Sequence, residues 1–353
     1  MRFLPPGSAR LTRRTAAAAC VVLALLGTAA CSGDEPAGTA TPTAPPARST
    51  PTGSQSAGPS GSASGSASSA SVKPSANTNA VKVSGDFGDT PKLTFPTPFA
   101  IDKTQTRVLK PGTGAVVRSG SVEINYFAVN ARTGKKFDES YSSKQTASLS
   151  LDGVIPGFSK GLTGQKVGSR VLIAVAGPDG YDPTGGNAQA GINVGDTLLF
   201  TVDIVTAQLP GPVGDTVTPP DGLPTVTEAG GVPAIEVPKT DAPSKLVVQP
   251  LIKGKGKKVA ATDQVVTNYR AVSWTDGAKV FDTYGAAPET SAVSATIPGL
   301  VEALVGQPVG SRVLVVVPPA QGYPDGNATP KVDKNVTLVF VVDILFAAAP
   351  PPS

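Results

Sequence analysis

Residues 151–168, LDGVIPGFSKGLTGQKVG, are the stretch from which the fold can be worked out. A short apolar strand end precedes Pro156 and leads into a short helix. Phe158 and Leu162 are four residues apart, so they share one face of that helix. A weaker copy, TIPGLVEALVGQPVG, occupies residues 296–310, and both copies run into Val-Gly-Ser-Arg-Val-Leu, which opens a long apolar strand. We expect each copy to form the floor of a shallow apolar pocket.

These two stretches belong to a longer internal repeat. The matching segments are 122–141 with 265–284, where one residue must be inserted to align the two Phe-Asp pairs, 167–181 with 309–323, and 197–205 with 337–345. Two copies of about 120 residues are too few for a solenoid, so we interpret them as tandem domains. A chain of 353 residues has room for two such domains and for tails.

Each copy is mostly strand-like. Its apolar residues recur with period two, in runs rich in β-branched residues that are separated by Gly, Pro and Asp. Thr133-Gly134 and Asp276-Gly277 stand where a hairpin should turn. Only the segments after Pro156 and Pro298 look helical. The sequence therefore predicts an α+β fold, in which each domain is a curved antiparallel sheet wrapped over one short helix.

The composition changes sharply along the chain. Residues 1–31 read as an export signal, 32–79 as a disordered Ser/Gly/Ala/Pro linker, 80–208 as the first domain, 209–223 as a Pro/Gly-rich linker and 224–349 as the second domain. The 32–79 segment contains one large apolar residue, Val72, and cannot bury enough surface to offset its ordering entropy. As a flexible coil it would reach about 40 Å, enough to tether the folded part at a distance from a membrane.

Charge and residue usage exclude several classes of function. Of the 30 basic residues, four arginines precede Cys31, so the remainder carries 26 basic and 26 acidic residues and no net charge. A neutral chain has no overall attraction to phosphate, and we expect no nucleic-acid partner. There is no histidine, and the only cysteines are Cys20 and Cys31. Catalytic triads, metal sites built from His or Cys, and disulfide frameworks are therefore excluded from the domains.

The N-terminus resembles a bacterial lipoprotein signal. An arginine-bearing start is followed by an apolar run, which is too short to span a membrane comfortably, and by small residues before Cys31. The resemblance implies that Cys31 is lipidated and anchors the chain to the outer face of the cell membrane. Thr28 departs from the leucine usual in that signal, so cleavage after Ala30 and secretion remain an alternative.

The repeated motifs, taken in order, resemble the FKBP-type peptidyl-prolyl cis-trans isomerases. The motifs are a strand ending in Tyr, Gly-x-x-Phe-Asp, Val-Ile-Pro-Gly-Phe at a helix start, Val-Gly-x-Arg, a loop closing on Gly-Tyr, and Thr-Leu-x-Phe-x-Val. They cover roughly residues 95–206 and 243–346. The resemblance implies an apolar cavity that receives a proline ring, and donors that bind the carbonyl groups of a proline-containing polypeptide substrate. It implies no cofactor and no metal, and we expect a monomer.

Carried over by position, the resemblance assigns a set of site residues to each domain. In the first domain the catalytic candidates are Tyr126, Phe137, Asp138, Ile155, Tyr181 and Phe200, with Val154, Phe158 and Ile192 binding substrate. In the second domain the substrate-binding candidates are Tyr269, Phe281, Asp282, Ile297, Leu300, Tyr323, Val332 and Phe340. The N–H of Ile155 and the hydroxyl of Tyr181 would donate to substrate carbonyls.

The two copies depart from the family pattern to different degrees. The tryptophan usual at the pocket floor is Phe158 in the first copy and Leu300 in the second, and small residues near Ala147 replace an aromatic wall. Thr296 stands in the second copy where the first has Val154. We therefore expect a shallower second pocket and a more active first domain. Trp274, beside the predicted Asp276-Gly277 turn, is expected to be an exposed surface residue.

The activity that the resemblance implies suits this residue set. Rotation about an X–Pro bond crosses a barrier of about 20 kcal/mol, yet it breaks no bond and needs no nucleophile, base or metal. An apolar pocket favours the twisted, less polar amide, which is differential binding of the transition state. Two alternatives remain: a module that binds proline segments without catalysis, as a chaperone does, and a structural envelope protein in which these aromatic residues are only core.

Overall fold

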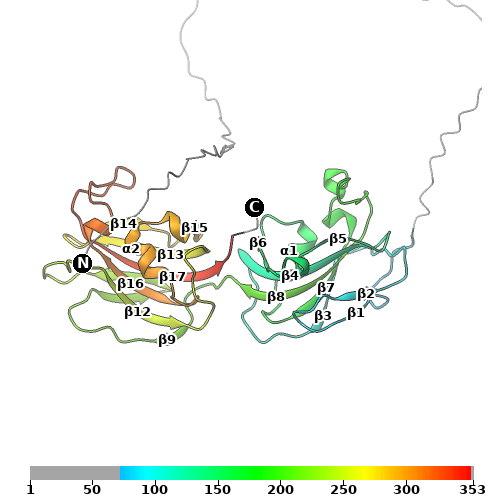
Figure 1. The fold of residues 1–353 in the computed structure, drawn as a ribbon, viewed down its shortest axis with the longest axis horizontal. Coiled ribbons are helices and arrows are strands. Elements are labelled where there is room, and N and C mark those ends of the chain that lie inside the picture. Colours follow the sequence, from blue (N-terminus) through cyan, green and yellow to red (C-terminus); the bar gives the residue numbers. More distant parts are fainter. Residues whose placement is uncertain (1–71, 351–353) are drawn as a thin grey trace, which may run out of the picture. The chain divides into compact units, whose positions relative to one another are not determined.

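The computed structural model describes residues 72–350 (Figure 1). The predicted export signal, the lipidation site Cys31 and most of the predicted 32–79 linker lie outside the described residues. The last residues of that segment differ from the expected free linker. The N–H of Ser75 donates to the carbonyl of Ala100 at 2.8 Å, and Thr78 is buried. The first domain therefore begins several residues before residue 80.

The first domain is built on one antiparallel sheet with the strand order β3-β7-β8-β4-β5, and β6 pairs with the other half of β4. The bounds are β3 Gln105–Lys110, β4 Ser121–Asn130, β5 Lys135–Glu139, β6 Ala147–Ser150, β7 Arg170–Val175 and β8 Leu198–Ala207. The predicted turn is present at Gly134, whose N–H donates to Asn130 and whose φ is +70°.

The second domain repeats this sheet with the order β14-β13-β17-β16-β12-β9, and β15 pairs with β13. The bounds are β9 Gly214–Thr216, β12 Val247–Gly254, β13 Gln264–Ser273, β14 Lys279–Asp282, β15 Glu289–Ala292, β16 Arg312–Val317 and β17 Leu338–Ala348. The N–H of Gly277 donates to Ser273, as the predicted turn requires.

One short helix packs on the equivalent face of the sheet in each domain. It is α1 (Pro156–Leu162) in the first domain and α2 (Pro298–Leu304) in the second (Figure 1). Phe158 and Leu162 are both buried, so the predicted shared face of α1 is confirmed. They join a core cluster with alternate residues of β7 and β8, such as Ile173 and Phe200. The predicted α+β layout, with each sheet wrapped over one short helix, is confirmed.

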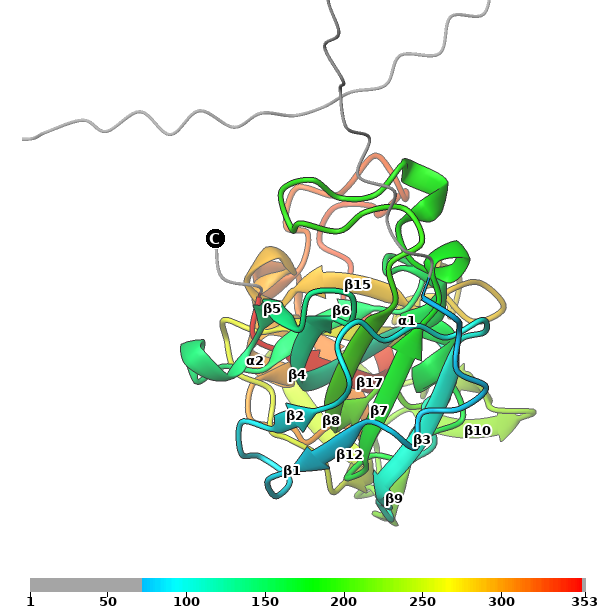
Figure 2. The same cartoon turned by 90° about the vertical axis from the view of Figure 1, so that its right-hand side faces the viewer.

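A β-hairpin covers the opposite face of each sheet, which the sequence analysis did not predict (Figure 2). The hairpins are β1 (Lys82–Ser84) with β2 (Lys92–Thr94), and β10 (Thr225–Ala229) with β11 (Val232–Glu236). Each encloses a second apolar cluster with the outward residues of the sheet, such as Leu172 in the first domain and Leu314 in the second. Each domain thus has three layers.

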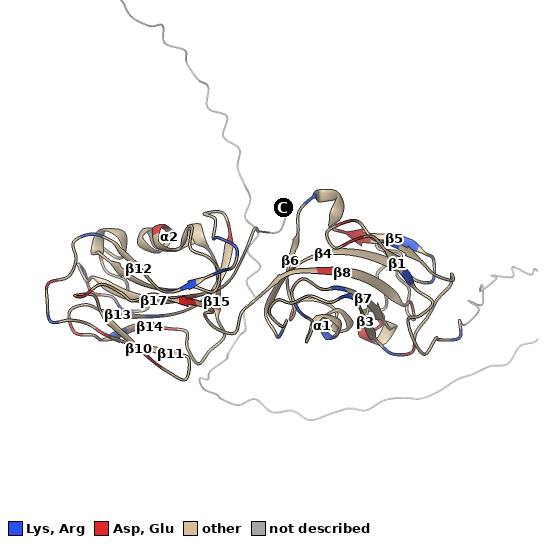
Figure 3. Cartoon of the chain, turned by 90° about the horizontal axis from the view of Figure 1, so that it is seen from below, with Lys and Arg blue, Asp and Glu red and all other residues tan. Residues whose placement is uncertain are grey.

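A buried ion pair joins the two central strands of each sheet at this outer face. Arg170 of β7 bonds Asp203 of β8 through Nε at 2.6 Å and Nη2 at 2.7 Å. Figure 3 colours the basic position of β7 blue and the acidic position of β8 red. Arg170 also donates to the carbonyls of Gly85 and Asp89 in the first hairpin. Arg312 and Asp343 repeat the pair in the second domain. The repeated Val-Gly-Ser-Arg motif therefore supplies the residue that fastens each hairpin to its sheet.

The segment 209–223 differs from the free linker that its composition predicts. The N–H of Leu209 donates to Leu345, and β9 pairs with β12 along Gly214–Thr216. The prediction for Trp274 is wrong, because its side chain is only 7% exposed and its Nε1 donates to the carbonyl of Thr240 at 2.9 Å. The cause is the outer apolar layer, which covers it.

Helix α1 lies unusually close to β7. A Cβ at Gly157 would lie 2.4 Å from Val175 Cγ1, and one at Gly161 would lie 2.5 Å from Ile173 Cγ2. Real Cβ atoms do not approach so closely, so glycine at these two positions allows the helix to rest directly on the strand. The seat of Phe158, which lies between them in the sequence, depends on this contact.

Gly161→Ala should destabilise the first domain by about 1–3 kcal/mol, the usual cost of forcing extra volume into a packed site. Gly153→Ala is the matched control, because its added Cβ would meet only the Ser150 carbonyl, at 3.6 Å, and its effect should be small. Urea unfolding of both variants, followed through first-domain amide signals, measures the difference. Equal midpoints for the two variants would contradict the close packing of α1.

Within residues 72–350 no helix is long and apolar enough to cross a membrane.

Candidate functional site

Three phenylalanines form the wall and floor of the candidate site in the first domain. Phe158 of α1 packs edge-on against Phe200 of β8, with ring centroids 5.0 Å apart. Phe137 of β5 meets Phe200 in the same manner at 5.8 Å. Phe158 and Phe200 are buried, whereas Phe137 is half-buried at the edge of the cluster. The sequence prediction that these three residues converge is confirmed by their contacts, although their part in binding stays a prediction.

A polar pair stands beside this aromatic wall. The hydroxyl of Tyr126 on β4 donates to Oδ2 of Asp138 at 2.7 Å, and the Glu139 N–H donates to Oδ1 at 2.8 Å. Burial, followed by the hydrogen bond to Asp138, raises the pKa of Tyr126 above its ordinary value. The phenol therefore stays protonated at neutral pH and holds the exposed carboxylate in place.

Two further donors of the first domain have no partner within the described residues. Ile155 caps the start of α1, its carbonyl accepts from Phe158 and Ser159, and its own N–H donates to no atom of residues 72–350. The hydroxyl of Tyr181, half-buried against the core cluster, also forms no hydrogen bond there. Val154 lies half-buried in the same wall, and Ile192 is buried behind it. Both donors are thus available to a ligand carbonyl.

The second domain encloses a cavity of about 310 Å³ at the corresponding place. Among the residues lining it are six of the eight sequence-predicted candidates, namely Tyr269, Phe281, Ile297, Leu300, Tyr323 and Phe340. Phe281 lies 5.9 Å from Phe340 and 6.2 Å from Tyr323, measured between ring centroids. Val332 is buried in the adjoining core and Asp282 points elsewhere, so neither lines this cavity. The second domain thus has an open cavity at this place, and the expectation that it is shallower than the first pocket stays a prediction.

The position of Asp282 corrects the alignment of the two copies. Ser140 and Thr283 make the same bonds to Tyr126 and Tyr269, so the strands match without an inserted residue. A β-bulge interrupts each hairpin, and Asp138 lies opposite Ala128 where Phe281 lies opposite Ala271. Because side chains alternate between faces along a strand, a shift of one residue sends the next carboxylate to the outer face.

Asp282 accordingly faces Arg270 across the strand pair. Its Oδ2 accepts from Arg270 Nη2 at 2.8 Å and from Lys279 Nζ at 3.1 Å. Burial alone would disfavour its charge, but these bonds outweigh burial and hold the pKa of Asp282 below its ordinary value. The predicted substrate-binding part of Asp282 is therefore not supported by its placement.

A different carboxylate, Glu289, lines the second cavity, and the sequence analysis did not identify it. It opens β15, and its Oε2 accepts from the hydroxyl of Tyr269. The repeat gave no signal for it, because the position corresponds to Ala147 of β6 in the first domain. Sheet register was needed to find it.

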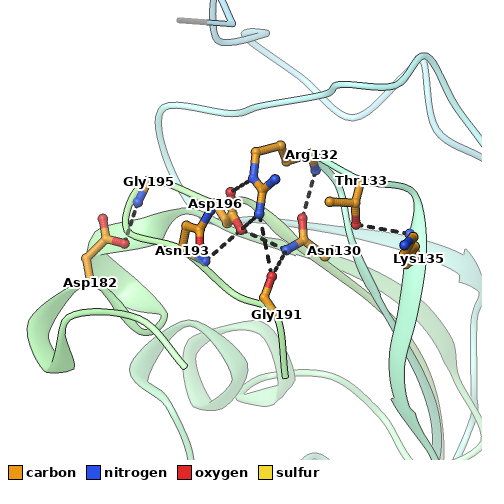
Figure 4. Close-up of polar contacts among 9 residues, drawn as sticks. All are labelled: Asn130, Arg132, Thr133, Lys135, Asp182, Gly191, Asn193, Gly195 and Asp196. Atoms are coloured by element: carbon orange, nitrogen blue, oxygen red, sulfur yellow. Dashed lines mark hydrogen bonds and ion pairs between the residues drawn. The ribbon is translucent and has the colours of Figure 1, made fainter. Parts of the chain in front are cut away.

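A charged network anchors the loop that carries Tyr181 and Ile192 in the first domain (Figure 4). The buried carboxylate of Asp196 accepts from Arg132 Nε at 2.6 Å, Asn130 Nδ2 at 2.7 Å and the Asn193 N–H at 2.9 Å. The corresponding second-domain positions carry Val336, Ser273 and Thr275, which cannot form this network. The loop beside the first site is thus held more firmly by charge.

Arg132→Ala should loosen this loop. Removing a charged donor from a buried carboxylate costs about 1.5–3 kcal/mol, so the Asn193 amide should exchange with solvent at least tenfold faster. Hydrogen exchange measured by NMR tests this, with Thr275→Ala, at the corresponding second-domain position, as the control without effect. Unchanged protection of Asn193 in Arg132→Ala would show that the network does not anchor the loop.

The same loop should depend on acid pH. Burial of Asp196 opposes its ionisation, but hydrogen bonds from Arg132, Asn193 and Asn130 outweigh burial and keep its pKa below the ordinary value. A lowered folded-state pKa contributes stability above the unfolded value of about 3.9, and this stability is lost as the pH falls through the folded value. The Asn193 amide shift should therefore stay constant above pH 4 and change only below it, and Arg132→Ala should move the change to higher pH. A wild-type midpoint above pH 4 would contradict the network.

The arrangement can bind and orient a ligand. Within residues 72–350 no three acidic, histidine or cysteine side chains converge on a metal site. The first site provides an aromatic wall, a tyrosine held by a carboxylate, and two unpaired donors. The second provides a partly open aromatic cavity in which a carboxylate accepts from a tyrosine hydroxyl. Such a site suits an apolar ring flanked by peptide carbonyls.

Comparison with known proteins agrees with this geometry. A family model for the FKBP-type peptidyl-prolyl cis-trans isomerase matches residues 112–205 and 255–345, one span in each domain. A probable FK506-binding protein of Corynebacterium glutamicum is 36% identical over 97 residues, which are 27% of this chain and 80% of that protein. The isomerase FkpA of Escherichia coli is 33% identical over 110 residues, 31% of this chain and 39% of that protein.

The crystal structure of FkpA from Escherichia coli aligns with 32% of this chain and 52% of that chain, at 34% identity and a TM-score of 0.28. The sequence match covers 39% of FkpA, which is less than half of the length of that protein. The family model, by contrast, covers more than half of this chain in two separate matches. The chain therefore belongs to the FKBP-type peptidyl-prolyl cis-trans isomerase family and contains two tandem copies of its domain.

Proposed function

We propose that the chain catalyses the cis-trans isomerisation of X–Pro bonds in exported polypeptides and so assists their folding. The observation that carries this proposal is the first site, where the Tyr126–Asp138 pair and the unpaired N–H of Ile155 surround the aromatic wall. These groups match an apolar proline ring and its neighbouring carbonyls in size and polarity.

Catalysis follows from differences between the planar and the twisted amide. Twisting the X–Pro bond ends its resonance and lowers the polarity of its oxygen and nitrogen, so an apolar wall binds the twisted form better than water does. Donors at the rim, Ile155 N–H and Tyr181 Oη, hold the flanking carbonyls while the bond between them turns. The Tyr126–Asp138 pair fixes the wall on the other side.

The first domain carries most of the activity in this proposal. Its hairpin has the carboxylate of Asp138 at the β-bulge, where it accepts from Tyr126. The bond between Asp196 and Arg132 anchors the loop that carries Tyr181. The second domain, with Leu300 in place of Phe158 and Asp282 on the outer face, contributes less to catalysis and more to holding the chain of a client. Two linked sites on one extended client raise its avidity.

Lipidated Cys31 holds the protein at the outer face of the cell membrane, where it works as a monomer. The support is the sequence before Cys31 and the Ser/Gly/Ala/Pro composition that follows it. Cys31→Ser should release the chain from the membrane fraction into the medium. If cleavage after Ala30 and secretion hold instead, the wild-type chain is already in the medium and carries no lipid by mass spectrometry.

The activity on proteins is tested by refolding a model protein whose slow phase is limited by one X–Pro bond. The fragment 72–353, which contains all the described core residues, should speed that phase in proportion to its concentration. The same fragment should leave the fast, proline-independent phase unchanged. Loss of aggregation without any change in the slow phase would contradict the isomerase.

That last outcome would favour a second candidate, a binding module for proline segments without catalysis. One observation favours this candidate for the second domain, namely that no carboxylate occupies the Asp138 position there. Peptide binding at Tyr269 and Tyr323 without rate enhancement would identify it.

A further inference from the structure

The second cavity contains one carboxylate, and it stands on a different strand from that of the first site. Glu289 of β15 lies opposite Thr267 of β13, where the first domain has Ala147 opposite Ile124. In the first site the acceptor for the tyrosine hydroxyl is Asp138 of β5, which pairs with the other end of the same edge of β4. The second site has thus lost a carboxylate from one wall and gained one on another.

Glu289 keeps the hydrogen-bonding part of that carboxylate and exposes its charge. It accepts from Tyr269 Oη, lines the cavity and remains open to solvent. It forms no ion pair with any lysine or arginine of residues 72–350. Asp282, by contrast, forms ion pairs with Arg270 and Lys279. The charge of Glu289 is therefore free to meet a ligand.

The remaining groups around the cavity are uncharged. The titratable neighbours are Tyr269 and Tyr323, and burial, together with the nearby Glu289, raises the pKa of both above the ordinary value. The other lining residues are apolar or neutral, among them Phe281, Leu300 and Asn327. A carboxylate without an ion-pair partner attracts a cation through its charge, and the aromatic rings beside it attract the same cation through their quadrupoles.

We propose that Glu289 is the specificity-determining residue of the second domain and selects proline segments that carry lysine or arginine next to the proline. The proposal rests on the proposed function in one respect, that the proline ring occupies the aromatic cavity. Consecutive Cα atoms lie about 3.8 Å apart, so the side chain next to a seated proline starts at the rim where Glu289 stands. The first domain, with Ala147 at this position, lacks the selection.

The test is an NMR titration of the ¹⁵N-labelled fragment 72–353 with three hexapeptides, Gly-Ala-Xaa-Pro-Ala-Gly, in which Xaa is Lys, Leu or Glu. A fourth peptide, Gly-Ala-Leu-Pro-Lys-Gly, places the cation after the proline. Amide shifts near Tyr269 and Tyr323 report the second site, and those near Tyr126 and Tyr181 report the first in the same sample. Each peptide is also measured for cis-trans exchange.

We expect the second site to bind at least one lysine peptide about threefold more tightly than the leucine peptide and about tenfold more tightly than the glutamate peptide. The preference should shrink at about 1 M salt, where the Debye length falls to about 3 Å. The first site should not share it. Equal affinities of the second site for all four peptides, or no binding there, would overturn the proposal.

Two variants separate the charge from the fold. Glu289→Gln keeps an acceptor for Tyr269 and should abolish the lysine preference while leucine-peptide binding is retained. Glu302→Gln, on the exposed side of α2 and outside the cavity, should keep the preference. A lysine preference that survives Glu289→Gln would reject the assignment. A preference without any acceleration of exchange would leave the assignment intact and refute the proposed isomerase activity.

Discussion

Replacing Phe137 and Asp138 together by alanine should remove most of the isomerase activity of the chain. The double change takes away one aromatic wall of the first site and the acceptor of the Tyr126 hydroxyl. Contact with one large apolar side chain is worth about 1.5–3 kcal/mol, which corresponds to roughly a tenfold to hundredfold loss of kcat/KM if it acts on the twisted amide. Exchange spectroscopy on an X–Pro peptide measures it.

The control for this prediction is Lys135→Ala, an exposed residue on the same strand with no side-chain contact in the site. It should leave the rate unchanged. The activity that survives the double variant belongs to the second domain, and Phe281→Ala added to it should remove that remainder. A double variant with undiminished activity would mean that the first site is not the principal one.

Arg312→Met should destabilise the second domain by about 3–5 kcal/mol, since it strands a carboxylate in the interior. Asp343 is almost fully buried, and without Arg312 it retains only the Tyr284 hydroxyl as a side-chain donor, at 2.7 Å. Arg312 also holds the β10–β11 hairpin through Glu228 and the carbonyl of Gly231. The hairpin should therefore detach earlier than the sheet unfolds.

The single tryptophan makes this measurable. Trp274 is buried in the second domain's outer layer, so its fluorescence in a urea titration reports that domain alone. Arg170→Met breaks the matching pair of the first domain and should not move the fluorescence transition. Adding Asp343→Leu to Arg312→Met should recover much of the loss, because an apolar pair replaces a stranded charge. An unchanged midpoint in Arg312→Met would contradict the buried-charge account.

The inner half of each domain could be predicted from the sequence because its signals are local. The four-residue spacing of Phe158 and Leu162 and the period-two pattern of the strands indicate which side chains face the helix core. The glycines indicate where the strands turn. The face toward the helix is the one that the family motifs describe. Convergence of Phe137, Phe158 and Phe200 followed from motif order and is found in their ring contacts.

The outer half was missed because it depends on partners distant in sequence. Trp274 looked like a surface residue beside a turn, and only the packing of residues 223–242 over it explains its burial. The hairpins themselves carry a signal that could have been used. Residues 225–236 alternate in polarity around a Gly-Gly turn, the pattern of a two-residue hairpin.

The second site shows why motif matching fails at single residues. Aligning Phe-Asp with Phe-Asp required an insertion, and it placed Asp282 in the pocket. The backbone instead keeps the same spacing from Tyr126 to Ser140 as from Tyr269 to Thr283, and a bulge decides which residues face inward. One step of register exchanges the two faces of a strand. Glu289 could not be found by the same method, because its counterpart, Ala147, has no comparable chemistry.

The central claim is that these aromatic sites accelerate rotation about X–Pro bonds. Exchange spectroscopy on a short X–Pro peptide with fragment 72–353 tests it without a coupled protease or a folding client. Unaided, the two isomers interconvert over tens to hundreds of seconds. We predict exchange cross-peaks within about a second whose rate grows with protein concentration and falls at least tenfold in the Phe137→Ala/Asp138→Ala variant. An exchange rate that stays at the unaided value at every protein concentration would contradict the account.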